Sequence, residues 1–184
     1  MPTFFIYLHT QSMNNNNCIE FFTATCLNWQ NLLEPDKYKS ILIDSFQYLT
    51  REEKIWLYGF VLMPNHIHLI WRKQDKWINS NIQQQFLKYT AQMIKFDLLE
   101  KNPSELEKYK STQKDRVYHF WERRPYSSRM LRRDVLEQKL EYIHLNPVKK
   151  CIVVKEEDYL FSSSRFYRGL GDDFGILTDY REHI

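Results

Sequence analysis

Residues 54–73 constrain the fold of this chain more than any other stretch. They read KIWLYGFVLMPNHIHLIWRK, two apolar runs of strand-like composition that meet at Pro64 and Asn65. Proline followed by asparagine favours a tight turn, so the stretch predicts a β-hairpin formed by residues 54–64 and 65–73. Both runs are apolar enough to be buried strands, which means that the rest of the chain must supply elements that cover them.

The remaining sequence alternates between strand-like and helix-like patterns. Two further strands are predicted where β-branched and aromatic residues dominate, over residues 18–28 and 115–122. Three helices are predicted from three- and four-residue spacing of apolar residues, over residues 35–49, 79–102 and 133–148. The order β, α, β, β, α, β, α is typical of an α+β domain with an antiparallel sheet and helices packed on it.

Two details of the helices can be predicted as well. The apolar stripe of the second helix should consist of Ile82, Phe86, Tyr89, Met93 and Phe96, which are spaced by four, three, four and three residues. The last helix should be stopped by its proline at position 147, because proline restricts the residue before it.

The length of 184 residues suits a single domain, and three cysteines without a CxxC pair argue against both disulfides and a thiolate zinc site. Residues 1–17 end in the tract MNNNN and are predicted to be a flexible N-terminal arm before a catalytic domain at 18–184. No apolar run is long enough for a signal peptide or a membrane span, so we expect a cytoplasmic protein.

Two histidines, His66 and His68, follow the predicted turn inside a strand. Side chains two positions apart in a strand project from the same face at a spacing of about 7 Å, so two neutral imidazoles there could share a metal ion. They could equally be a surface pair or core histidines bonded to the backbone. A third ligand or a reactive group has to decide between these readings.

Tyr142 and Asn146 lie one turn apart in the last predicted helix, on a flank away from its apolar stripe. A phenol beside a metal and a basic groove suits nucleophilic attack on a phosphodiester, which leaves a covalent phosphotyrosine. The amide oxygen of Asn146 could complete the ligand set of the metal. The alternative is a boundary tyrosine and a helix cap before proline.

The net charge of +3 is modest, but residues 121–133 read WERRPYSSRMLRR, with five arginines against one glutamate. Cations contact phosphates and aromatic rings stack on unpaired bases, so next to a phosphodiester site this stretch favours contact with DNA. The predicted DNA-binding residues are Trp121, Arg123, Arg124, Arg129, Arg132, Arg133 and Lys149. The alternative is a solvated basic loop with Trp121 in the core.

Four segments occur in a suggestive order: MPNHIHLIW, FWERRPYSSRMLR, EYIHLNPVKKCIV and DYLFSSSRFY. Together they resemble the IS200-like Y1 (HUH) transposases, and most closely the REP-associated tyrosine transposases, over roughly residues 18–168. The metal-binding histidine motif of that family matches His66 and His68. Its nucleophilic tyrosine, and the amide ligand one turn later, match Tyr142 and Asn146.

The resemblance implies a ferredoxin-like antiparallel sheet and a DNA transposase that cleaves and transfers single-stranded DNA with foldback hairpins through a 5'-phosphotyrosine. It implies magnesium or manganese, although imidazole ligands also allow other transition metals. Monomers and homodimers both remain open. Lys150 and Cys151 depart from the family, which commonly has small residues after the asparagine-proline pair.

Two alternatives to a strand transferase remain. The chain could be a catalytically weak or domesticated module that only binds single-stranded or hairpin DNA, or RNA. It could also be a metal-dependent phosphodiesterase in which water is the nucleophile. Formation of a phosphotyrosine at Tyr142 separates both alternatives from the transferase.

Overall fold

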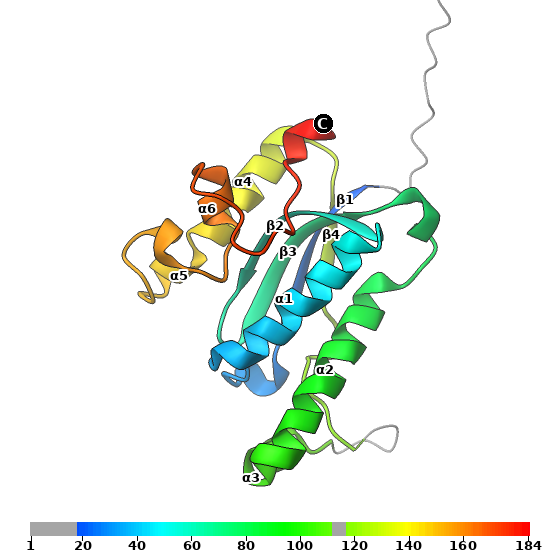
Figure 1. Cartoon of the computed structure of the whole chain (residues 1–184), viewed down its shortest axis with the longest axis vertical. Coiled ribbons are helices and arrows are strands. Elements are labelled where there is room, and N and C mark those ends of the chain that lie inside the picture. Colours follow the sequence, from blue (N-terminus) through cyan, green and yellow to red (C-terminus); the bar gives the residue numbers. More distant parts are fainter. Residues whose placement is uncertain (1–17, 112–116) are drawn as a thin grey trace, which may run out of the picture.

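The computed structural model describes residues 18–111 and 117–184, so the predicted arm at 1–17 lies outside the described residues. The strands form one antiparallel sheet in the order β2-β3-β1-β4. They are β1 (Ile19–Thr25), β2 (Ile55–Leu62), β3 (His66–Lys73) and β4 (Tyr126–Met130). The α-helices are α1 (Asp36–Arg51), α2 (Ile82–Lys101), α3 (Pro103–Leu106), α4 (Arg133–His144), α5 (Asn146–Lys149) and α6 (Ser164–Tyr167). This ferredoxin-like arrangement confirms the predicted fold class (Figure 1).

The predicted hairpin is formed by β2 and β3. Its turn is closed by the backbone N–H of Met63, which donates to the carbonyl of His66 at 2.8 Å. β3 is an inner strand, paired with β2 on one side and with β1 on the other. The histidine-bearing strand is therefore held along both edges.

Helices α1 and α2 cover one face of the sheet (Figure 1). Phe46 of α1 stacks on Phe86 of α2 with ring centroids 5.0 Å apart, and it also lies 6.1 Å from Phe60 of β2. Phe86 meets Trp71 of β3 at 6.2 Å. Since alternate residues of a strand point to opposite faces, the side chains of His66 and His68 lie on the face that α1 and α2 leave free.

Helix α4 packs on that second face, and a glycine permits its close approach. A Cβ atom on Gly59 of β2 would lie 3.2 Å from Cδ1 of Ile143 and 3.6 Å from Cδ2 of Leu140, both on α4. Any larger residue at position 59 would push α4 away from β2. The position of Tyr142, which neighbours Ile143, depends on this contact.

The buried stripe of α2 differs from the prediction. Ile82 and Phe86 are buried as expected, but Thr90, Ile94 and Leu98 follow them, and Tyr89, Met93 and Phe96 are exposed. A row with a constant step of four drifts around a helix and is the ridge that packs against a neighbouring helix. Helix α1 contacts this side, because the Tyr38 hydroxyl donates to Oδ2 of Asp97 at 2.9 Å.

The prediction of a strand over residues 115–122 is wrong in its position. Within the described part of this stretch, Tyr118 and Trp121 make only isolated bridges, to Lys110 and Cys26. The fourth strand is β4, which pairs with β1 from Ile19 opposite Met130 to Thr23 opposite Tyr126. β4 lies at the sheet edge and is largely exposed, so it lacks the apolar alternation that identifies a buried strand.

The single helix predicted over 133–148 is also corrected. Helix α4 ends at His144, and after Leu145 a short helix α5 begins at Asn146. Pro147 occupies the first turn of α5, and the helix that begins at Arg133 ends three residues before it. Proline is favourable there because its missing N–H would have no partner in the first turn.

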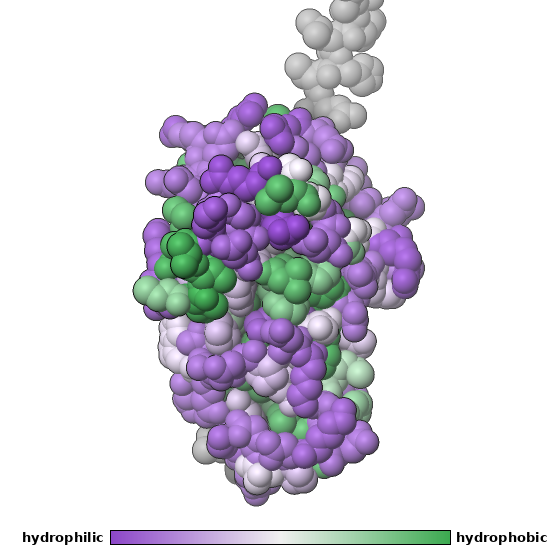
Figure 2. Space-filling model, turned by 60° about the vertical axis from the view of Figure 1, so that its left-hand side comes forward, coloured by the Kyte–Doolittle hydropathy of each residue, from purple (hydrophilic) through white to green (hydrophobic). Residues whose placement is uncertain are grey.

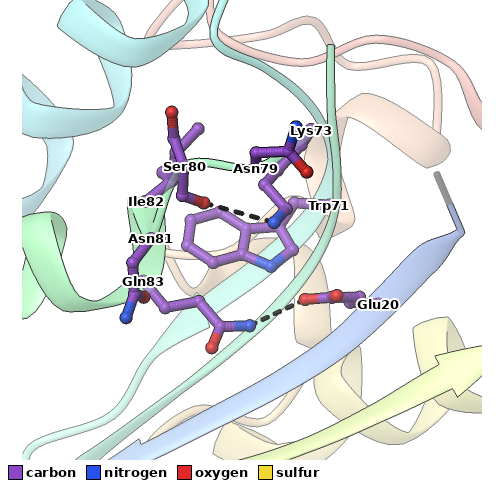
Figure 3. A pocket seen from close by; sticks show the side chains of 8 residues that line it. All are labelled: Glu20, Trp71, Lys73, Asn79, Ser80, Asn81, Ile82 and Gln83. Carbon is purple, nitrogen blue, oxygen red and sulfur yellow. Dashed lines mark hydrogen bonds between the residues drawn. The ribbon is translucent and has the colours of Figure 1, made fainter. Parts of the chain in front are cut away.

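The start of α2 is fixed to the sheet by polar contacts around a cavity of about 280 Å³ (Figure 3). Nε2 of Gln83 donates to Oε2 of Glu20 at 2.7 Å, and Nζ of Lys73 donates to the carbonyl of Ser80 at 3.2 Å. Trp71 lies between these groups. The cavity is on the α2 side of the sheet and is separate from the histidine face.

None of the helices in the described ranges combines the length and the apolar character needed to cross a bilayer. The face seen in Figure 2 is mainly hydrophilic, and its hydrophobic areas are separate patches. Isolated apolar patches of this kind are normal on a protein surface.

The contact at Gly59 can be tested by a double mutant. Gly59→Ala should lower the free energy of unfolding by about 1 to 3 kcal/mol, because its methyl group would crowd Ile143. Ile143→Val removes the crowded Cδ1 atom, so the double variant should lose less stability than the sum of the two single variants. Chemical denaturation measures all four proteins, and strict additivity would contradict the contact.

Candidate functional site

The two histidines form a pair on the face of the sheet on which α4 packs. The ring centroids of His66 and His68 are 4.8 Å apart, and the residues are only 7% and 6% exposed. The sheet register places Thr23 opposite His68 and Thr25 opposite His66. The expectation that both imidazoles project from one face is met.

Each imidazole is oriented by a hydrogen bond at Nδ1. Nδ1 of His66 lies 2.7 Å from Oδ1 of Asn65, and Nδ1 of His68 lies 2.7 Å from the hydroxyl of Thr23. An amide oxygen only accepts, so Nδ1 of His66 carries the proton and Nε2 keeps its lone pair. Nε2 of His68 is buried without a hydrogen-bond partner in the described part of the chain.

Both imidazoles are neutral at physiological pH. Burial lowers the pKa of His66 to about 4, with a further contribution from the charge of Lys150. Burial also lowers the pKa of His68 to about 3, helped by His66 and Lys139. Neutral imidazoles with Nδ1 held by other groups are the form in which histidine binds a metal.

The two imidazoles suit a metal ion as part of a larger ligand set. No group of three or more His, Cys, Asp or Glu side chains that could hold a metal is found among residues 18–111 and 117–184. Two imidazoles are too few for a complete ligand set, so any further protein ligand must be of another type, such as an amide. The unpartnered Nε2 of His68 fits a ligand role, since a buried nitrogen without a partner is otherwise unfavourable.

Tyr142 stands beside the histidine pair in the same chain. Its ring centroid is 5.3 Å from that of His68 and 6.4 Å from that of Phe21 on β1. The residue is 41% exposed, so its phenol remains open to a large substrate. A candidate nucleophile and the two imidazoles thus meet without a second subunit.

The position of Asn146 agrees only partly with the sequence prediction. It is the first residue of α5, one turn beyond Tyr142, and it is buried, whereas the sequence suggested an accessible flank. Among the described residues its side chain forms no hydrogen bond to either imidazole. Its place one turn beyond Tyr142 is as predicted, and its role as a metal ligand stays a prediction.

Lysines surround the tyrosine, and one of them was missed in the sequence. Nζ of Lys139 lies 5.5 Å from the Tyr142 ring centroid, and Nζ of Lys149 lies 5.6 Å from it. Both lysines line an open cavity of about 440 Å³ beside Tyr142. Positions 139, 142, 146 and 149 are spaced by three, four and three residues, the spacing of neighbours on one side of a helix. This spacing is the sequence pattern that could have identified Lys139.

The predicted DNA-binding residues lie on several elements of the structure. Arg123 and Arg124 line a groove of about 820 Å³ between α2 and residues 118–125. Trp121 also lines this groove but is only 4% exposed, so its ring does not present an open stacking face. Arg129 lies on β4 opposite Glu20.

The two arginines at the start of α4 already have acidic partners. Arg132 is ion-paired with Asp134, and Nε of Arg133 is 2.8 Å from Oε1 of Glu137. All four side chains are largely exposed, so these pairs contribute little stability and can be exchanged for phosphate. Whether any of the predicted arginines contacts DNA stays a prediction.

The C-terminal part of the chain holds α4 in place. The Ser163 hydroxyl is 2.8 Å from Nε2 of His144 at the end of α4, and it accepts from the backbone N–H of Phe60 at 3.0 Å. At the other end of α4, the Tyr180 hydroxyl donates to Oε1 of Glu137 at 2.8 Å. These contacts fix the helix that carries Tyr142 against β2.

Comparison with protein-family models gave no match, and comparison with curated protein sequences gave none either. Among solved structures, a REP-associated tyrosine transposase bound to a REP hairpin is similar to this chain. The TM-score is 0.60 at 20% sequence identity, and the alignment covers 97% of this chain and 98% of the other. At this identity the similarity shows a shared fold and nothing more.

Ser163→Ala should lower the free energy of unfolding by about 1 to 3 kcal/mol, because it leaves a buried imidazole nitrogen and a buried backbone N–H without their partner. Ser40→Ala is the matched control, since Ser40 is an exposed serine on α1. Thermal and chemical denaturation measure both variants. Equal stability of the two would show that the Ser163 hydroxyl does not hold α4.

Proposed function

We propose that this protein is a metal-dependent tyrosine transposase that cleaves and transfers single-stranded DNA. The observation that carries the proposal is that the exposed Tyr142 has its ring 5.3 Å from the ring of the buried His68. A phenol is a weak nucleophile by itself and needs a polarised target. The similar structure of a REP-associated tyrosine transposase supports this class of chemistry for the fold.

In the proposed reaction, the phenol oxygen of Tyr142 attacks the phosphorus of a DNA phosphodiester. The new bond joins the tyrosine oxygen to phosphorus, the bond from phosphorus to the 3'-oxygen breaks, and the phenol proton ends on the released 3'-hydroxyl. The DNA remains attached through a 5'-phosphotyrosine. Because one phosphodiester replaces another, a free 3'-hydroxyl can reverse the step and join a new strand without ATP.

His66 and His68, with Asn146 as a third ligand, would hold the divalent metal. When bound, such an ion polarises the scissile phosphate and stabilises the charge that develops on it. The chain's contribution is to orient the ligands: Thr23 and Asn65 fix the imidazole rings through their Nδ1 atoms. Magnesium and manganese are the proposed ions, and imidazole ligands favour manganese of the two.

The proposed substrate is single-stranded DNA with foldback hairpins. The similar transposase structure is bound to a REP hairpin, which supports this choice. The groove lined by Arg123 and Arg124, together with the exposed Arg129, Arg132, Arg133 and Lys149, would contact phosphates. Tyr142 and the histidines lie together in one chain, which supports catalysis by residues of the same subunit.

The proposed nucleophile can be tested with a labelled hairpin DNA. Wild-type protein with manganese should form a covalent protein–DNA adduct that survives a denaturing gel, and Tyr142→Phe should form none. Tyr89→Phe is the matched control, because Tyr89 is an exposed tyrosine on α2 and should leave the adduct unchanged.

Other results would favour the alternative functions. Tight hairpin binding without any adduct, on a broad panel of hairpins, would favour a binding module. Cleavage that persists in Tyr142→Phe would indicate that water is the nucleophile, as in a phosphodiesterase.

The metal dependence can be tested through the hydrogen bond that orients His68. Chelation should abolish adduct formation, and Thr23→Val should raise the manganese concentration for half-maximal activity by about 10- to 100-fold. Thr25→Val is the control, because the Thr25 hydroxyl makes no hydrogen bond within the described residues. An equal effect of both variants would argue against the orienting role of Thr23.

A further inference from the structure

Lys139 on α4 points its ammonium group into the candidate active site. Nζ lies 4.8 Å from the ring centroid of Phe21 and 5.5 Å from that of Tyr142. The same charge contributes to the lowered pKa of His68. The side chain is therefore close to the imidazole pair and to the phenol at once.

The surroundings of Lys139 hold more cations than anions. Lys139 forms no ion pair with a carboxylate in the described part of the chain, unlike the nearby Arg133, which is paired with Glu137. The adjacent charges are Lys149, which lines the same cavity, and Lys150, whose charge acts on His66. Glu141 lines the cavity and is the acidic residue among its lining groups.

Lys139, Lys149 and Lys150 outnumber the one carboxylate of the cavity, Glu141, so this region favours an anion. The cavity of about 440 Å³ is open and borders the Tyr142 ring, so it can admit a phosphodiester at the position of attack. Aromatic rings on two sides fix the ammonium group, which limits its alternative conformations.

We propose that Lys139 is a catalytic residue that binds a non-bridging oxygen of the phosphodiester attacked by Tyr142. This inference rests on the proposed function and adds a residue to it. The ammonium group neutralises charge that accumulates on the phosphate oxygens as the tyrosine–phosphorus bond forms and the bond to the 3'-oxygen breaks. It transfers no proton, and it holds the same oxygen in the phosphotyrosine.

The test compares Lys139→Gln and Lys139→Arg with the wild type. Lys95→Gln is the charge-matched control, since Lys95 lies on α2, which covers the opposite face of the sheet. The probe is a fluorescent single-stranded DNA with a foldback hairpin and randomised flanks. For each protein, the rate of adduct formation is measured on denaturing gels, the dissociation constant by fluorescence anisotropy, and folding by thermal denaturation.

Lys139→Gln should lower the rate of adduct formation about 100-fold, as for loss of one group that stabilises transition-state charge. Its dissociation constant should change by about threefold or less, because many other phosphate contacts remain. Lys139→Arg should restore part of the rate, and Lys95→Gln should match the wild type. A Lys139→Gln rate within about threefold of the wild type would overturn the proposal, as would a rate loss fully explained by weaker DNA binding.

A second readout keeps this inference separate from the proposed function. If the wild type forms no adduct, the proposed function fails, and chemical labelling of lysines is then measured with and without the same DNA. Protection of Lys139, but not of Lys95, would support a phosphate bound at Lys139. Equal labelling of Lys139 in both conditions would overturn it.

Discussion

The antiparallel pairing of β1 with β3 is the constraint on which the site depends. This register sets Thr23 opposite His68, so the threonine hydroxyl can orient the imidazole at 2.7 Å. It also places Phe21 against the rings of His68 and Tyr142. A shift by one residue would turn both histidines toward α1 and α2. β3 is held by neighbours on both edges, which makes such a shift costly.

The second requirement is that α4 lies close to the sheet at a fixed position. Gly59 allows the close approach, and Ser163 links the end of α4 to the edge strand β2. The same C-terminal region covers β2 in other places, since the hydroxyls of Tyr159 and Tyr167 donate to carbonyls of Leu62 and Tyr58. The segment DYLFSSSRFY therefore has a structural use: it positions the helix that carries the tyrosine.

Sequence patterns predicted those elements whose buried face is evident from their own residues. The hairpin, the strand with His66 and His68, and the extents of α1 and α2 follow from local periodicity. β4 could not be found in this way, because the pairing of its exposed residues with β1 decides its position. The buried side of α2 depended on its contact with α1. Lys139 was overlooked because a lysine on a helix is usually solvated.

The central claim is that the imidazole pair binds a metal ion beside Tyr142, and the location of a bound ion tests this most directly. A crystal grown with manganese would be measured by anomalous diffraction. We predict an anomalous peak within about 2.0 to 2.3 Å of Nε2 of both His66 and His68, on the side of Tyr142. A peak at another site, or none at the histidine pair under saturating manganese, would contradict the claim.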